Sequence, residues 1–314
     1  MIRRIFKYIS LALLLFLVSS CVYSHLTTMN ATAPFERVEV EPDRFIHARC
    51  VGDAEKPFVL YDAGAFGVYA DGWWIQEALK DDVRICTYDR AGMGWSDPVP
   101  TNTAPSVLWH VEDMRRLVAA LGVEKPYYII GHSMSGFRLH TYANTYPDDL
   151  AGLIFIDAAR PQNFDFDNLP RWMKLMRPLS SLGPIAARLG LMRAVFTVAP
   201  DPLALPGQAG KDKRRSRSIV SHMQAARAEL LAVAISQEHY KATAAEHLPV
   251  SVFAASAGGG NNRITAENAK VHTGFGRLHP HPEESHVSLL AEPTASLIAA
   301  DMLAMIKHVE QSAP

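Results

Sequence analysis

The stretch YYIIGHSMSG, residues 127–136, decides how the rest of the chain is interpreted. An apolar, β-branched run ends in a glycine, a serine follows two residues later, and small residues then lead into an amphipathic segment. This order predicts a strand, a sharp turn and a helix, with Ser133 at the turn. A serine on such a turn projects into a cleft, and the amide of Met134 then lies at the helix N-terminus, where it favours a developing oxyanion.

The small residues after the serine depart from the usual G-x-S-x-G pattern, because Ser135 stands in the last position and Gly136 follows it. The pattern needs small residues there because the helix backbone passes close to neighbouring strands, and serine adds only a hydroxyl. The alternative is that Ser133 is a helix N-cap in an ordinary strand-to-helix turn. The surrounding chain has to decide between the two interpretations.

Strands and helices are expected to alternate on both sides of this stretch. Short strands are expected at 38–40 and 45–51, buried strands at 57–61, 83–88, 153–156 and 250–254, and helices at 73–80, 105–121 and 293–309. This rhythm predicts an α/β fold with a mostly parallel sheet and helices on both faces. Residues 160–247 are rich in proline and amphipathic stretches without a convincing strand, which predicts a helical cap inserted between core segments 35–159 and 248–314.

Composition narrows the classes of function. The chain has 314 residues, 48% of them hydrophobic, and a formal net charge of −1. It is long enough for a large core with an inserted subdomain. A net charge so close to zero gives no general electrostatic reason to expect nucleic-acid binding, so small-molecule chemistry is favoured.

The N-terminus has the pattern of an export signal. Residues 1–7 are basic, residues 9–18 are almost wholly apolar, and Cys21 follows two serines. The end of this segment resembles the lipobox of bacterial lipoproteins, which implies a signal at 1–21 and lipidation of Cys21. The alternative is an uncleaved signal anchor over about residues 6–22. Both place the body on a linker, residues 22–34, anchored to the membrane and facing the periplasm or cell exterior.

Two further features of the sequence, a pair of cysteines and a basic run, each allow two interpretations. Cys50 and Cys86 each fall in an expected strand, where the default is a pair of buried thiols, and a disulfide is the alternative if the strands are neighbours in an exported domain. The basic run at 211–215 is expected to be a solvated face, with contact to a membrane surface as the alternative.

From residue 35 onwards the chain resembles the α/β-hydrolase superfamily. The resemblance rests on the Asp62-Ala63-Gly64 loop, a glycine-rich turn that starts at Arg90, the turn at Ser133, and Glu284-Ser285-His286-Val287 before a terminal helix. It implies a mostly parallel eight-stranded sheet with an inserted helical cap. It also implies that Ser133 is a nucleophile, that His286 is its base, and that the amides of Met134 and Ala65 bind the oxyanion.

The third member of the triad has to be a carboxylate that orients the histidine. Most relatives carry it after the strand that corresponds to residues 250–254, but this chain has no aspartate between Asp212 and Asp301. A subset of the family carries it at the end of the strand after the nucleophile helix, where Asp157 stands. Asp157 is therefore preferred over the alternative, Glu267.

The resemblance favours a serine hydrolase that cleaves a carboxylic ester through an acyl-enzyme, with no cofactor. Relatives that open epoxides or cleave carbon–halogen bonds use an aspartate in place of Ser133. His279 and His281 do not have the spacing of a known metal site. The alternatives are an aminopeptidase or amidase, an acyltransferase, and an inactive binding lipoprotein. An aminopeptidase would need a cap carboxylate for the substrate ammonium, and the candidates are Asp165, Asp167 and Glu238.

Overall fold

A single eight-stranded sheet forms the centre of the molecule. The computed structural model describes residues 2–29, 31–163, 171–235 and 244–312. The strand order is β1-β2-β4-β3-β5-β6-β7-β8. The strands are β1 Glu36–Glu41, β2 Arg44–Val51, β3 Phe58–Asp62, β4 Arg84–Tyr88, β5 Tyr127–His132, β6 Leu150–Ile156, β7 Val250–Ala254 and β8 Gly276–Pro280. β2 is antiparallel to β1 and β4, and the other neighbours are parallel, so the predicted mostly parallel sheet is confirmed.

The central strands are apolar along their whole length because helices cover both faces of the sheet. Every residue of β3, β5, β6 and β7 is buried. The covering helices are α2 Trp73–Leu79, α3 Val107–Ala120, α4 Ser135–Thr145, α10 Arg263–Thr273 and α11 Thr294–Ser312. α3, α4 and α10 pack into one core, and α2 and α11 pack into the core on the other face. α10 was not anticipated from the sequence.

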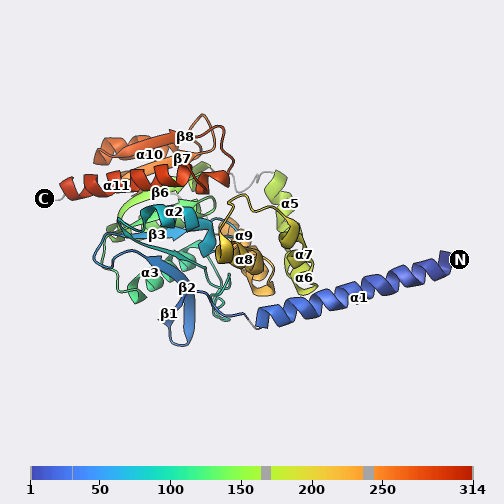
Figure 1. Ribbon diagram of the computed structural model, residues 1–314. Coiled ribbons are helices and arrows are strands. Elements are labelled where there is room, and N and C mark those ends of the chain that lie inside the picture. The colour runs from blue at the N-terminus through green and yellow to red at the C-terminus, as the bar shows by residue number, and fades with distance from the viewer. Residues whose placement is uncertain (1, 30, 164–170, 236–243, 313–314) are drawn as a thin grey trace.

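In the described residues between β6 and β7, five α-helices follow one another, and we call them the cap. They are α5 Arg171–Ser180, α6 Gly183–Arg188, α7 Leu191–Val198, α8 Gly207–Ser216 and α9 Val220–Ile235. The described residues of this insertion contain helices and no strand. In Figure 1 the cap lies beside the sheet on the side from which α1 extends.

The basic run on α8 is not the solvated face that the sequence suggested. Lys213 is buried, and its ammonium lies 3.0 Å from Asp71 and 3.1 Å from Asp201. Burial alone would raise the pKa of Asp71, but Lys213 and Arg217 lower it to about 2. The run therefore includes an internal ion pair that joins the cap to the core, which a count of charges along the chain does not reveal.

Cys50 and Cys86 are not the free thiols expected by default. They lie opposite each other on the antiparallel strands β2 and β4 and form a disulfide. Directly opposed residues on neighbouring strands are close enough for such a bond. The disulfide therefore ties the antiparallel edge of the sheet to its parallel centre.

The N-terminal segment forms one helix, α1 Ile2–Met29. Among the described residues, its span Arg3–Thr28 is long and apolar enough to cross a membrane, judged by length and composition. The helix continues through Cys21 to Met29, so most of the expected linker at 22–34 is helical. Figure 1 shows α1 projecting away from the body of the protein.

We expect acid to lower the free energy of unfolding, because four buried histidines have lowered pKa values. Burial lowers the pKa of His110, His132, His140 and His222 from 6.5 to about 4. Between these values the unfolded chain takes up protons that the folded chain does not, so the free energy of unfolding falls as the pH falls from 6.5 to 4. From pH 7 to pH 5 each histidine is expected to contribute a loss of about 1–2 kcal/mol.

Denaturant unfolding of the full-length protein in detergent at pH 7 and pH 5 measures this loss. His140→Gln should make the loss smaller by the contribution of one histidine, because the fully buried ring no longer titrates. The matched control is His272→Gln, at an exposed position on α10. An unchanged difference between the two pH values in His140→Gln would contradict the assignment.

Candidate active site

Ser133 lies on a sharp turn between β5 and α4. Its backbone has a φ of 56°, in the left-handed region that non-glycine residues rarely adopt. The amide of Ser133 donates to the carbonyl of Ile156 at the end of β6 over 3.0 Å, which holds the turn against the sheet. The side chain is therefore presented at the carboxyl edge of the central strands, where α/β sheets bind ligands.

The two residues after Met134 explain the departure from the usual pattern. A Cβ on Gly136 would collide with the carbonyl of Ala159, so glycine is required at this position. Ser135 is buried, and its hydroxyl donates to the Asp62 carboxylate. Serine is tolerated at 135 because its added hydroxyl has a partner.

A chain of hydrogen bonds joins Ser133, His286 and Asp157. His286 Nε2 lies 2.9 Å from Ser133 Oγ, and His286 Nδ1 lies 2.6 Å from Asp157 Oδ2. Hydrogen bonding to His286 lowers the pKa of Asp157, so this group is a carboxylate at neutral pH. The imidazole is half-exposed, which leaves it accessible from the solvent side. In this arrangement the imidazole can accept the serine proton while the carboxylate fixes its tautomer.

Asp157 reaches His286 because it directly follows β6. Its backbone has a φ of 39°, its amide donates to the Phe253 carbonyl over 2.7 Å, and the Ala255 amide donates to its carboxylate. Glu267 lies elsewhere, exposed on α10 and paired with Arg263 at 2.7 Å. The structure therefore brings Asp157, and not Glu267, to His286.

The expected oxyanion donors belong to segments that meet beside Ser133. A Cβ on Gly64 would lie 2.8 Å from the Cβ of Ser133, so the loop after β3 passes directly over the serine. The side chains of Ala65 and Met134 pack in one small apolar cluster. The amide of Met134 precedes the first residue of α4, where helix N–H groups have no partner within the helix.

Two buried arginines hold the carbonyl side of this loop. Arg90 donates to the carbonyls of Ala63 and Gly64, each over 2.7 Å. Arg138 on α4 donates to the same Ala63 carbonyl over 2.7 Å and to Asp62 over 2.6 Å. With its carbonyls held by these cations, the loop is fixed in one orientation beside Ser133.

The charge of Arg90 is balanced from the cap. Glu229 on α9 accepts from Arg90 Nε over 2.6 Å and from its terminal nitrogen over 3.0 Å, and both side chains are buried. Burial alone would raise the pKa of Glu229, but Arg90 and Arg138 lower it to about 2. Sequence reasoning missed this network. The available signal was the one acid of α9, Glu229, directly before the apolar stretch 230–235.

We expect Glu229→Gln to lower the free energy of unfolding by about 3 kcal/mol, because it leaves part of the Arg90 charge uncompensated in a dry environment. Chemical denaturation measures the change. The control is Glu267→Gln, which removes an exposed ion pair and should leave stability unchanged. Equal stability of the two variants would show that Glu229 does not stabilise the buried network.

His132 contacts both the backbone and the ring of His286. Its Nε2 lies 2.9 Å from the carbonyl oxygen of His286, and the two ring centroids are 4.6 Å apart. Burial and the neighbouring His286 lower the pKa of His132 to about 4, so the ring is neutral at pH 7 and donates its Nε2 proton. A neutral ring at this place supports the backbone of His286 without adding a second positive charge when His286 is protonated.

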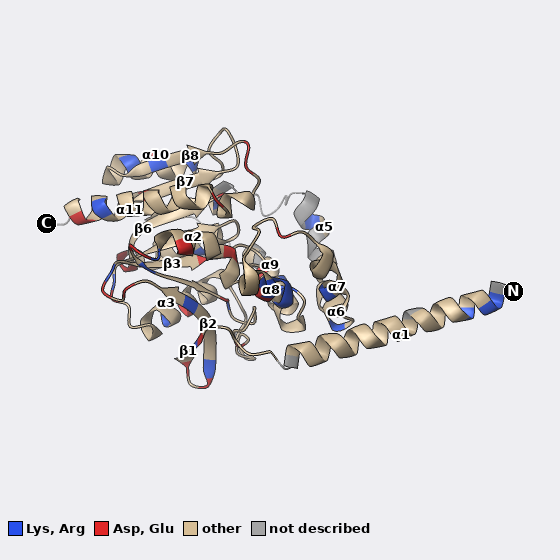
Figure 2. Ribbon diagram, viewed as in Figure 1, with Lys and Arg blue, Asp and Glu red and all other residues tan. Residues whose placement is uncertain are grey.

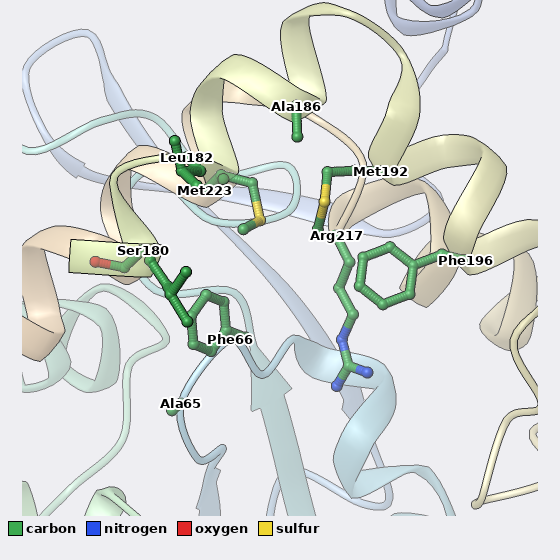
Figure 3. A pocket seen from close by; sticks show the side chains of 11 residues that line it. Ala65, Phe66, Ser180, Leu182, Ala186, Met192, Phe196, Arg217 and Met223 are labelled. Atoms are coloured by element: carbon green, nitrogen blue, oxygen red, sulfur yellow. The ribbon is translucent and has the colours of Figure 1, made fainter. Parts of the chain in front are cut away.

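An apolar cavity of about 580 Å³ adjoins the loop after β3, at Ala65 and Phe66. Figure 3 shows Ala65 and Phe66 on the core side and cap residues on the other. The lining residues are Ala65, Phe66, Leu179, Ser180, Leu182, Gly183, Ala186, Met192, Phe196, Arg217 and Met223. Ala65 directly follows Gly64, which lies over Ser133, so this cavity can hold the apolar part of a molecule whose reactive group lies at the serine.

The remaining predicted residues lie outside this cluster. Cys21 is a free cysteine on α1. His279 Nε2 lies 3.1 Å from Asp301, and both His279 and His281 stack on Phe253. Asp165, Asp167 and Glu238, the carboxylates named for an aminopeptidase, fall outside the described residues.

Comparison with known proteins gives the same fold. Residues 62–231, more than half of the chain, match a family model described as the alpha/beta hydrolase fold. A protein of Agrobacterium fabrum with the provisional name carbamate hydrolase RutD is 34% identical over 116 residues, which cover 36% of this chain and 42% of that protein. The chain spans half or less of the length of the curated relatives that it matches.

Two solved structures show the same arrangement at lower identity. A thermophilic esterase from Thermogutta terrifontis superposes with a TM-score of 0.61 at 19% identity, over 89% of this chain and 99% of that one. An enol-lactonase from Burkholderia xenovorans superposes with a TM-score of 0.59 at 14% identity, over 86% and 99%. With the family model, the sheet order and the turn at Ser133 in agreement, the chain belongs to the α/β-hydrolase fold family.

Proposed function

We propose that this protein is a serine hydrolase that cleaves a carboxylic ester through an acyl-enzyme intermediate. The observation that carries the proposal is the continuous hydrogen-bond chain from Ser133 Oγ through His286 to Asp157, with spacings of 2.9 and 2.6 Å. A serine is activated by such a chain, because its hydroxyl is barely ionised at neutral pH without a base. A purely structural serine on a strained turn has no need of it.

In the proposed reaction Ser133 Oγ attacks the ester carbonyl carbon while His286 Nε2 takes the hydroxyl proton. The amides of Met134 and Ala65 stabilise the oxyanion, and Asp157 stabilises the imidazolium. The tetrahedral intermediate collapses, the carbon–oxygen bond to the alcohol breaks, and His286 returns the proton to the leaving alkoxide. Water then attacks the acyl-enzyme with His286 again as base, which releases the acid and restores Ser133.

The cavity supports an apolar ester as the substrate. Its walls are mostly aliphatic, aromatic and methionine side chains, and they include Ala65, which directly follows the Gly64 that lies over Ser133. The fold is shared with proteins named as an esterase and an enol-lactonase. Burial of an alkyl chain contributes about 0.8 kcal/mol for each methylene, so a cavity of this kind selects for chain length.

We further propose that the N-terminal segment anchors the protein to a membrane with the enzymatic body outside the cytoplasm. Arg3, Arg4 and Lys7 precede the apolar part of α1, and basic residues remain on the cytoplasmic side of membrane helices. The Cys50–Cys86 disulfide is independent support, because disulfides persist in oxidising compartments. Cys21 stays the proposed lipidation site if the segment is processed.

The function is tested with the full-length protein in detergent micelles. We expect turnover of p-nitrophenyl butyrate and covalent labelling by a fluorophosphonate, with the adduct located on Ser133 by peptide mass spectrometry. Heat-denatured protein serves as the control, because the label needs the assembled hydrogen-bond chain. Folded protein that neither turns over the ester nor takes the label would exclude the serine hydrolase.

A further inference from the structure

Helices α5–α7 of the cap carry a group of exposed apolar side chains. Outside α1, six of the ten large apolar side chains that are exposed in the described residues belong to this part of the cap. They are Leu175, Leu179, Leu182, Ile185, Val195 and Val198, and we call them the cap face. Apolar groups that gather on one surface mark a site of interaction, and the question is what covers this one.

The charge around the cap face fits an anionic lipid surface. Between Asp167 and Asp201 the sequence contains five basic residues and no acidic residue, although the whole chain has a net charge of −1. In Figure 2 the coloured parts of α5, α6 and α7 carry blue segments and no red one. Amphipathic helices with apolar and basic residues lie in membrane interfaces, where anionic lipids attract them.

The cap face also adjoins the segment that reaches the membrane. Gly190, in the turn between α6 and α7, packs directly against Ser20 of α1. The guanidinium of Arg193 on α7 lies 5.8 Å from the centre of the Tyr23 ring. In Figure 1 helices α5, α7 and α6 form a row that runs at a steep angle to α1. α6 is the member of this row nearest to α1, and α1 extends past it toward the N-terminus.

The length of α1 indicates where along this helix the outer surface of the bilayer lies. An 18-residue helical run over residues 5–22 is about 27 Å long, close to the roughly 30 Å of a bilayer's hydrocarbon core. If the basic N-terminus lies at one membrane surface, the other surface falls near residues 20–23, where α1 touches the cap. A lipid on Cys21 would place the surface at the same height, so both forms of anchor bring α5–α7 to the membrane.

We propose that the cap face rests on the lipid bilayer and that the active-site cavity opens into it. Leu179 and Leu182 are exposed on the cap face and also line the cavity, so they form a continuous apolar path from the membrane to Ala65. The substrate class that follows is an ester with an alkyl chain dissolved in the membrane, and this part rests on the proposed ester hydrolysis. A water-soluble ester reaches Ser133 without use of the path.

Position and depth are measured with one added tryptophan in the full-length protein, reconstituted in vesicles of phosphatidylcholine and phosphatidylglycerol. Val198 on α7 is 82% exposed and Val271 on α10 is 81% exposed, so Val198→Trp and Val271→Trp are a matched pair. We expect brominated lipid to quench the added fluorescence of Val198→Trp and aqueous iodide to quench that of Val271→Trp. Iodide quenching of both would overturn the proposal. Protection of Val198→Trp from both quenchers would also overturn it, because a second copy of the chain would then cover the face.

The substrate path is measured by turnover of a long-chain ester in the vesicles and of a soluble short-chain ester. Val195→Glu and Val198→Glu, neither of which lines the cavity, should lower turnover of the vesicle ester by about tenfold and leave the soluble ester unaffected. Val271→Glu should affect neither. If Val195→Glu and Val198→Glu lower the turnover of both esters equally, or of neither, the proposed substrate path is wrong. If the wild-type protein hydrolyses neither ester, the ester hydrolase has failed, while tryptophan quenching still decides whether the cap rests on the bilayer.

Discussion

Ser133→Ala lowers kcat for p-nitrophenyl butyrate by about 10⁶-fold, the scale expected when the nucleophile of such a triad is removed. The loss is this large because the acyl-enzyme can no longer form on the serine, so that only direct attack by water, assisted by substrate binding and the oxyanion donors, remains. The fold should be unaffected, since alanine and serine pay the same penalty for a φ of 56° and the replaced hydroxyl only contacts His286. Stopped assays with purified protein at high concentration are sensitive enough to measure the residual rate.

The control for this variant is Ser296→Ala, on the exposed side of α11, which should keep wild-type kcat. Fluorophosphonate labelling should disappear in Ser133→Ala and persist in Ser296→Ala. Turnover above a few per cent of wild type in Ser133→Ala would show that another residue is the nucleophile.

Asp157→Asn lowers kcat by about 10⁴-fold, because the neutral amide carries no charge to stabilise the imidazolium and its NH₂ group can donate to Nδ1, which favours the wrong tautomer of His286. The side chain keeps its size, so the hydrogen bonds of its backbone and the position of His286 should be preserved. The loss therefore appears in kcat more than in KM. The measurement is a full kinetic analysis of this variant beside Glu267→Gln.

Glu267→Gln is the matched comparison because Glu267 was the alternative acid and carries an equally conservative change. It should retain wild-type kcat, since the side chain is exposed and pairs with Arg263. The reverse pattern, with Glu267→Gln inactive and Asp157→Asn active, would exclude Asp157 as the acid.

The pattern of apolar and polar residues predicted those parts of the fold that are formed by residues close together in the chain. The apolar run before Ser133 is a fully buried strand and the residues after it start a helix, so the strand, turn and helix could be located from hydrophobic pattern alone. His286 and Asp157 were predicted from the resemblance to the α/β-hydrolase superfamily together with their positions after strands, and parallel strands that end at one edge of the sheet bring them close together.

Contacts between distant segments could not be predicted in the same way. Glu229 and Arg90 are 139 residues apart in the chain, so no spacing rule connects them. Lys213 lies in a basic run that resembles a solvated face, yet a buried carboxylate, Asp71, draws it inward. The disulfide depends on the register between β2 and β4, which the spacing of Cys50 and Cys86 does not specify.

The Arg90–Glu229 pair limits which caps can be exchanged between proteins of this fold. Arg90 belongs to the core and Glu229 to the cap, and both charges are buried. A chimera that receives a foreign cap without an acid at this position would keep Ser133, His286 and Asp157 but lose the partner of Arg90, which holds the loop after β3. Transplanted caps would therefore change turnover as well as selectivity, and directed evolution of such chimeras should recover an acidic residue facing Arg90 before it refines the cavity.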